Sequence, residues 1–243
     1  MLGELIEKYG IDNSQRAIQR AADFLFGFQA EEGDIRGIYG NQYTPNYTAG
    51  ITELLTKAGY QEDPRIEKAF RWLLSIRQDD GGWAISLRTK GFKLDVISMK
   101  GETIQPDRSK PFSHLVTGVV LRAFVAHKTY RKSIEARNAG RLLASRIFER
   151  DQYPDRNAAS FWTEFQFPFW FTDLLSALDS LTALGFAADD AYVSKGIKWL
   201  QSKQRPAGLW DLRILKGKDR QIDLWVCLAI CRVFKRLFNR SLE

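Results

Sequence analysis

The stretch WLQSKQRPAGLWD at residues 199–211 has a near copy in WLLSIRQDDGGWA at residues 72–84. Each begins with Trp-Leu, continues through charged and turn-forming residues, and closes on glycine and tryptophan. A third copy begins at Phe24-Leu25 and closes on Gly33 and Ile35. Positions agree within the copies, whereas the spacing between copies is unequal. We therefore predict a repeated structural unit with insertions between the repeats.

Each repeat has the pattern of a helical hairpin. An amphipathic helix comes first, for example over residues 64–76, with Asp63 as its N-cap and Pro64 in its first turn. A glycine-containing turn and a more apolar helix follow. The apolar helices are predicted at 46–59, 113–127, 171–185 and 223–238. The repeat units span about 14–60, 63–128, 132–186 and 188–238, and the third is degenerate because it lacks the closing Gly-x-Trp. The pattern predicts one all-α domain over residues 1–243, with no segment that alternates as a β-strand does.

Composition limits the classes of function. The chain has 243 residues, 44% of them hydrophobic and 27% charged, and a net charge of +7. Lysine and arginine are scattered among acids, so we expect no nucleic-acid partner. No apolar run reaches the ~20 residues that span a bilayer. The stretch MLGELIEKYG at residues 1–10 lacks a basic region followed by an apolar one, so we expect no secretory signal. We expect a cytoplasmic protein without a transmembrane segment, and contact with a membrane surface stays open. Cys227 and Cys231 are predicted to be small buried residues of one helical face.

The repeat resembles the QW repeat of squalene and hopene cyclases, which has a relative in protein prenyltransferase β subunits. Residues 195–210 match every position of Lys/Arg-Gly/Ala-x-x-aromatic-Leu-x-x-x-Gln-x-x-x-Gly-x-Trp. The resemblance implies an α/α toroid of inner and outer helices, in which glutamine and tryptophan connect helix ends. Four hairpins imply an incomplete ring or a small (α/α)6-like barrel. A second copy of the chain, or a different subunit, would complete an open wall.

The catalytic motifs that this resemblance would imply are missing from the sequence. Class II cyclases protonate their substrate with an Asp-x-Asp-Asp motif, and an Asp-Asp-x-x-Asp motif would hold magnesium at a diphosphate; neither is present. Protein prenyltransferases bind zinc with Asp, Cys and a later His. Asp223 and Cys227 have no histidine after them. We therefore expect no metal and no cofactor, and whether the protein is an enzyme stays open.

Polar residues at the starts of the four apolar helices form one candidate site. They are Asn46, Tyr47, Ser113, His114, Thr172, Asp173 and Asp223. Inner-helix N-termini meet at one mouth of a toroid, so these side chains are expected to face its cavity. Tyr47, His114 and Asp223 are predicted to contact a ligand. The alternative is that most of them only cap helices.

The aromatic stretch FWTEFQFPFWFTD at 161–173 is the second candidate. Its rings either plug the core or line an apolar cavity, and Trp162, Phe169 and Trp170 are predicted to contact a ligand. In terpenoid cyclases such aromatic walls stabilise carbocations. A carboxyl group in these surroundings has a raised pKa, so Asp173, with Glu164 second, is predicted as a catalytic acid. The basic segments 87–93 and 212–220 either hold a diphosphate or form a solvated rim.

Three functional hypotheses follow. The first is a protein that binds an isoprenoid or another hydrophobic ligand in an aromatic-lined central cavity, as a binder or as a cyclase- or prenyltransferase-like enzyme with unusual catalytic residues. The second is a non-catalytic scaffold or subunit that associates with other proteins. The third is a carbohydrate-active α/α-barrel enzyme, which the apolar character of the aromatic stretch disfavours.

Overall fold

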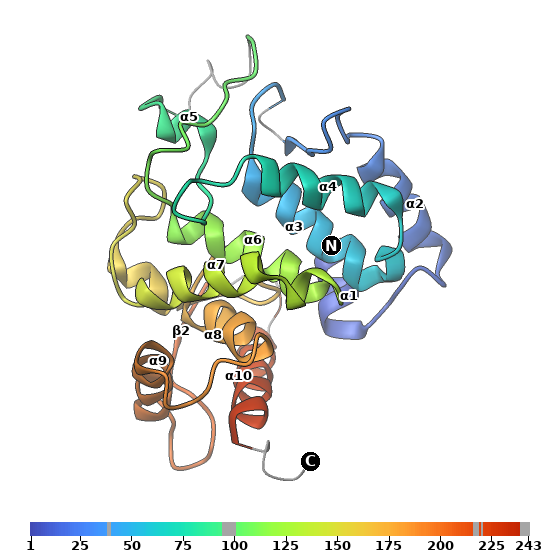
Figure 1. Cartoon of the computed structure of the whole chain (residues 1–243). Helices are drawn as coiled ribbons and strands as arrows, with labels where there is room; N and C mark the ends of the chain where they lie inside the picture. Colours follow the sequence, from blue (N-terminus) through green and yellow to red (C-terminus); the bar gives the residue numbers. More distant parts are fainter. Residues whose placement is uncertain (38–39, 94–100, 216–218, 220, 239–243) are drawn as a thin grey trace.

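The four apolar helices predicted from the sequence form the inner layer of an all-α, toroid-like fold (Figure 1). They are α3 (Pro45–Leu55), α6 (His114–Ala126), α8 (Leu174–Ala183) and α10 (Ile222–Phe238). α3 packs against α6, α6 against α8, and α8 against α10, so the inner helices follow one another in chain order. The computed structural model describes residues 1–37, 40–93, 101–215, 219 and 221–238.

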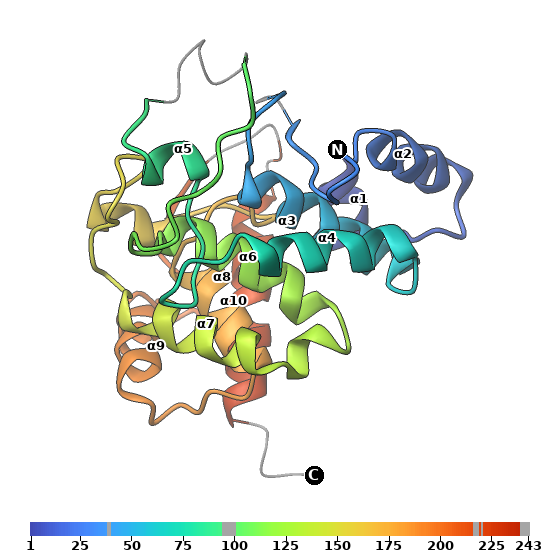
Figure 2. The same cartoon turned by 45° about the horizontal axis from the view of Figure 1, so that its top comes forward.

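The amphipathic helices form the outer layer. They are α2 (Arg16–Phe26), α4 (Pro64–Ser75), α7 (Ile134–Ser145) and α9 (Ala191–Ser202). α4 packs on α3, α7 packs on α6 and α8, and α9 packs on α8. Figure 2 shows α4 and α7 along the side of the molecule that faces the viewer. The predicted alternation of outer and inner helices is therefore confirmed.

Short elements fill the connections. They are α1 (Leu2–Tyr9), the π-helical turn Thr56–Tyr60, α5 (Ser86–Thr89), the 3-10 helices Tyr130–Lys132 and Ala159–Thr163, and the strands β1 (Glu164–Phe165) and β2 (Arg213–Ile214). β1 and β2 pair in parallel over two residues each. In the part of the chain that the structure describes, this pair is the sole sheet, which agrees with the predicted all-α class.

Helix starts follow the capping rules that the sequence indicated. The Asp63 carboxylate accepts a hydrogen bond from the backbone N–H of Arg65, and Pro64 opens α4. Asp190 caps α9 in the same way, through the N–H groups of Tyr192 and Val193. These aspartates satisfy backbone donors that have no partner inside the helix.

The glutamine and tryptophan of the repeat donate side-chain hydrogen bonds to backbone carbonyls in and next to the outer helices. The indole Nε1 of Trp83 donates to the carbonyl of Leu73 at 2.6 Å, and that of Trp210 donates to Leu200 at 3.0 Å. Both acceptors lie ten residues before the tryptophan, so the two repeats share one geometry. Gln29 donates both to Gly33, inside its own turn, and to Arg65 of α4, at 2.8 and 2.9 Å. The structural role predicted for the repeat is confirmed.

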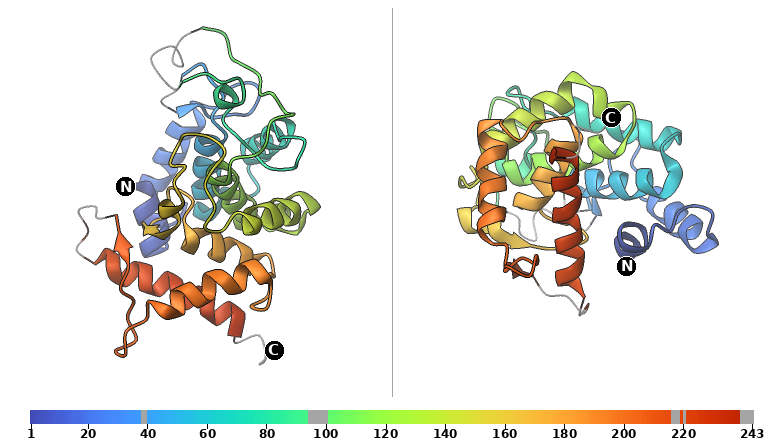
Figure 3. Two further views of the ribbon diagram at one scale, coloured as in Figure 1. Left: turned by 90° about the vertical axis from the view of Figure 1, so that its left-hand side faces the viewer. Right: turned by 90° about the horizontal axis from the view of Figure 1, so that it is seen from below.

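The helix α1 was not predicted, and it connects the first and last parts of the inner layer. Ile6 packs with Ile18 and Ala58 in a small apolar cluster. On the other side, Lys8 pairs with Asp219 at 2.6 Å and the ring of Tyr9 meets Trp225 of α10. Figure 3 shows α1 next to α10 when the molecule is seen from below. The N-terminal helix thus contacts both the first repeat unit and α10.

Both ends of the repeat array expose apolar side chains. In the first unit Phe24 is 67% exposed, although the equivalent Trp72 is buried. On α10, Leu224 and Leu228 are 55% and 53% exposed. The prediction that both cysteines are buried was wrong, because Cys231 is exposed and Cys227 is half-buried. No hairpin follows α10 to cover that side of the helix within the described part of the chain.

Candidate functional site

An apolar groove of about 500 Å³ lies between α1, α3 and the loop before α8. Its apolar lining includes Leu2, Leu25, Ile51, Leu54, Phe167, Pro168, Phe169, Trp170, Leu215 and Ile222. A volume of this size falls within the range of small-molecule sites, about 300–1,000 Å³. The groove is therefore the strongest candidate for a site that binds an apolar ligand.

The aromatic stretch is divided between the core and this groove. Trp162 and Phe165 are buried in the interior, and Phe167 is buried as well but borders the groove. Phe169 is half-buried and Trp170 is 43% exposed, and both line the groove. Trp170 meets the ring of Tyr47 edge-on, with the centroids 5.9 Å apart. One part of the stretch therefore fills the core, and another part lines the groove.

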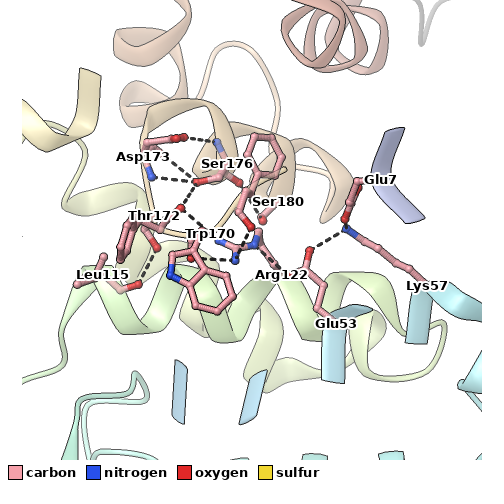
Figure 4. Close-up of polar contacts among 12 residues, drawn as sticks. Glu7, Glu53, Lys57, Leu115, Arg122, Trp170, Thr172, Asp173, Ser176 and Ser180 are labelled. Atoms are coloured by element: carbon pink, nitrogen blue, oxygen red, sulfur yellow. Dashed lines mark hydrogen bonds and ion pairs between the residues drawn. The ribbon is translucent and has the colours of Figure 1, made fainter. Parts of the chain in front are cut away.

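Glu7, Glu53 and Arg122 line the groove beside its apolar wall, and we call these three side chains the groove floor. Figure 4 shows them with Lys57, which pairs with two of them. The guanidinium of Arg122 on α6 pairs with the Glu53 carboxylate on α3 at 3.0 Å, and both side chains are nearly inaccessible. Lys57 pairs with Glu53 at 2.7 Å and also with Glu7 of α1. Burial alone would raise the pKa of Glu53, but the charges of Lys57 and Arg122 outweigh burial and hold this pKa below its usual value. The network is thus two carboxylates balanced by two cations.

Arg122 also holds the aromatic loop in place. Its guanidinium donates to the backbone carbonyls of Phe171 at 3.3 Å and of Phe169 and Trp170 at 3.4 Å. These carbonyls belong to the loop between β1 and α8, so they accept no hydrogen bonds from a helix backbone. Arg122 therefore connects the groove floor to the residues of its wall. Sequence reasoning missed it, although a single arginine inside the apolar run of 115–126 was a visible signal.

Asp173, the predicted acid, is the N-cap of α8. Its carboxylate accepts from the backbone N–H of Ser176 at 2.8 Å, and its own N–H donates to the Ser176 hydroxyl at 2.9 Å. Figure 4 shows the two side chains directed at each other. Burial raises the pKa of Asp173 to about 6, against the opposing effect of the hydrogen bonds from Ser176. Asp173 is not among the residues that line the groove.

Glu164, the second predicted acid, is held by two arginines. Its carboxylate lies 2.9 Å from Arg213 Nη1 and 3.6 Å from Arg156 Nη2. The Arg156 guanidinium in turn lies over the rings of Phe161 and Phe171. β1 and β2 bring Glu164 and Arg213 to neighbouring positions. Like Asp173, Glu164 lies outside the groove lining.

His114 and Trp162 form a separate buried pair. Their rings stack with centroids 4.7 Å apart, and the His114 Nδ1 lies 3.3 Å from Asp151 Oδ2. Burial lowers the pKa of His114, although the Asp151 charge acts in the opposite direction. Asp223 is exposed in the first turn of α10. Of the predicted ligand contacts, the structure brings together Tyr47, Phe169 and Trp170, and it places His114, Trp162 and Asp223 elsewhere.

The basic segments are partly paired with acids. Arg88 binds Asp155 at 2.6 Å, and Arg213 binds Glu164. Lys216, Lys218 and Arg220 lie outside the described residues, so the predicted diphosphate contact there is untested. Over the described ranges, no three His, Cys, Asp or Glu side chains gather in a way that could hold a metal ion. Nor does any helix there have the length and apolarity to cross a bilayer.

A comparison with known protein families matches the N-terminal part of the chain. Residues 1–101 match the family model of the squalene-hopene cyclase C-terminal domain. The matched segment includes the first repeat unit and the outer helix and turn of the second. The N-terminal part of the chain is therefore similar to this cyclase domain, and the tryptophan geometry seen at Trp83 recurs at Trp210, outside the matched segment.

Proposed function

We propose that the protein binds an isoprenoid-like hydrophobic ligand in the groove between α1, α3 and the 166–170 loop. The observation that carries the proposal is the half-exposed Trp170, which lies with Phe169 in a groove lined mainly by apolar side chains. An aromatic side chain left open to water inside an apolar groove gains free energy when a ligand covers it.

The groove floor suits a ligand with at most one polar end. Glu53 and Arg122 pair with each other, and Glu4, Glu7, Lys8 and Asp219 also line the groove, so it offers hydrogen-bonding groups to the polar end of a ligand. A terminal hydroxyl group could exchange hydrogen bonds there, while the hydrocarbon chain covers Trp170. The similarity of residues 1–101 to a squalene-hopene cyclase domain favours an isoprenoid-like chain over other apolar ligands.

A catalytic role for Asp173 or Glu164 stays a prediction. Asp173 would have to leave its cap on α8, and Glu164 would have to leave Arg213, before either carboxyl group could reach a substrate in the groove. Binding without catalysis needs no such change. We therefore place ligand binding first and turnover second.

The test is native mass spectrometry of the purified protein with farnesol and geranylgeraniol, after extraction of any lipid that copurifies. We expect a saturable one-to-one complex that Trp170→Ala weakens about tenfold, since a buried aromatic contact contributes about 1–2 kcal/mol. Tyr192→Ala is the matched control, because Tyr192 is equally exposed but lies on the outer helix α9. An equal loss of affinity in both variants, or no complex with the wild type, would exclude the groove as the site.

Exposed apolar side chains at the end of the array favour a second candidate function. Leu224, Leu228 and Phe238 recur at helical spacing on α10 and are exposed. A scaffold that associates with another protein would cover such a stripe. The oligomeric state of the protein tests this candidate.

A further inference from the structure

A second cavity, of about 610 Å³, lies at the C-terminal ends of α8 and α10. The Glu53–Arg122 pair lies between it and the apolar groove, which opens beside the N-terminal ends of the same helices. Side chains from α1, α3, α6, α8 and α10 surround the second cavity, together with Arg131 from the 3-10 turn after α6. Its lining is dominated by charged residues rather than by aromatic rings.

The charges of this cavity are unevenly distributed. On one side, Glu7, Glu53, Lys57 and Arg122 form the network already described, in which two carboxylates balance two cations. The remaining charged residues form the rim, and they are Arg131, Asp179, Arg232, Lys235 and Arg236. Four cations thus share one carboxylate, so the rim has a formal charge of +3.

Asp179 orients two of these cations without neutralising the rim. Its carboxylate lies 2.7 Å from Arg236 Nη1 and 3.8 Å from Arg232 Nη2. Arg232 and Arg236 are one helical turn apart on α10, so their guanidinium groups are neighbours. The Nε of Arg232 is buried and has no hydrogen-bond acceptor.

The other two cations are available to a ligand. Lys235 and Arg131 are exposed, and neither has an ion-pair partner within the described parts of the chain. Lys235 comes from α10, whereas Arg131 comes from the 3-10 turn after α6. The partial negative charge at the helix C-termini attracts these cations, but it amounts to only about half a charge per helix. Most of the positive charge of the rim is left uncompensated.

We propose that this cavity binds a small, soluble, multivalent phosphate compound between α10 and the turn at Arg131. Guanidinium groups match the geometry of phosphate oxygens, and three excess charges favour a polyanion over a monovalent ion. The cavity has room for several phosphoryl groups. The proposal does not depend on the ligand proposed for the apolar groove.

The experiment is isothermal titration calorimetry with inorganic tripolyphosphate at constant ionic strength. The wild type is compared with the double variant Arg131→Gln/Lys235→Gln. Both side chains are exposed, so the substitutions leave the core unchanged. We expect saturable binding that the double variant weakens at least about tenfold, since each charge-assisted contact contributes about 1.5–3 kcal/mol.

The matched control is Arg16→Gln/Lys198→Gln, which removes the same charges from exposed positions on the outer helices α2 and α9. We expect this control to bind like the wild type. If both double variants lost the same affinity for tripolyphosphate, the loss would follow from the lower net charge of the protein and not from this cavity, and the proposal would be overturned. Cosedimentation with phosphatidic acid vesicles, without any binding of tripolyphosphate, would also overturn it and would assign the rim to a lipid surface.

Discussion

At the scale of single residues, Asp173 combines a stabilising cap with an unfavourable buried charge. Burial raises its pKa to about 6 from an ordinary value of 3.8. Since the folded value is the higher one, the contribution to stability is fully present below pH 3.8 and is lost as the pH rises through 6. An asparagine in place of Asp173 would keep a capping oxygen but could not ionise.

We therefore predict that, relative to the wild type, Asp173→Asn has a higher free energy of unfolding at pH 7 than at pH 4. The advantage of the variant disappears towards pH 4. The rise in the pKa of Asp173 corresponds to at most about 3 kcal/mol in the free energy of unfolding, at about 1.36 kcal/mol per pKa unit. Urea unfolding of both proteins at pH 4, 5, 6 and 7 measures it. A difference in stability that stays constant over this range would contradict the raised pKa.

Residue patterns predicted the caps but not the groove floor. Asp63 stands directly before Pro64 and an amphipathic segment, which is the ordinary signature of an N-cap. Glu53 and Arg122 lie far apart in the sequence and meet only because α3 packs on α6. Such a network depends on tertiary distances, which the spacing of residues within one helix does not determine.

At the scale of elements, the repeated glutamine differs between the first and last units. Gln29 donates to Gly33 and also to Arg65 in the next outer helix. Gln204 is exposed, and within the described residues its side chain donates only to Gly208, at 3.1 Å. The first connection therefore joins two hairpins, whereas the second stabilises only its own turn.

We predict that Gln29→Ala destabilises the fold by about 2 kcal/mol and Gln204→Ala by about 1 kcal/mol or less, since a net hydrogen bond contributes about 1 kcal/mol. Chemical denaturation of the two variants beside the wild type measures this difference. Since the substitutions are identical, each variant is the other's control for helix and turn propensity. Equal losses would show that the bond to Arg65 adds nothing.

Elements with strong periodicity were predicted within a few residues, and short elements were not. The inner helices predicted at 113–127 and 223–238 are observed at His114–Ala126 and Ile222–Phe238. α1 has eight residues and belongs to no repeat, so neither periodicity nor internal similarity indicated it. Its position follows from contacts with Ala58 and Trp225, which are remote in the sequence.

At the scale of the whole molecule, the count of four hairpins left open whether the ring is incomplete or closes as a small barrel. In the structure, both ends of the repeat array expose apolar side chains. In a repeat array each unit buries its apolar face against its neighbour, and the terminal units need caps. α1 partly caps the array, yet Phe24 at one end and the stripe of Leu224, Leu228 and Phe238 at the other remain exposed. The sequence could not indicate which side chains these would be, because that depends on how far α1 covers each end.

We predict that the protein self-associates through the stripe on α10 and that Leu224→Glu/Leu228→Glu makes it monomeric. Two carboxylates in an apolar contact would have to be desolvated without partners, which costs several kcal/mol. Size-exclusion chromatography with light scattering, over a dilution series, measures the change. Ile134→Glu/Leu209→Glu is the control, because these equally exposed apolar residues lie on α7 and in the turn after α9. A wild type that is monomeric at every concentration would mean that the chain tolerates an open array without a partner copy. Dissociation of both double variants would instead attribute the effect to added negative charge.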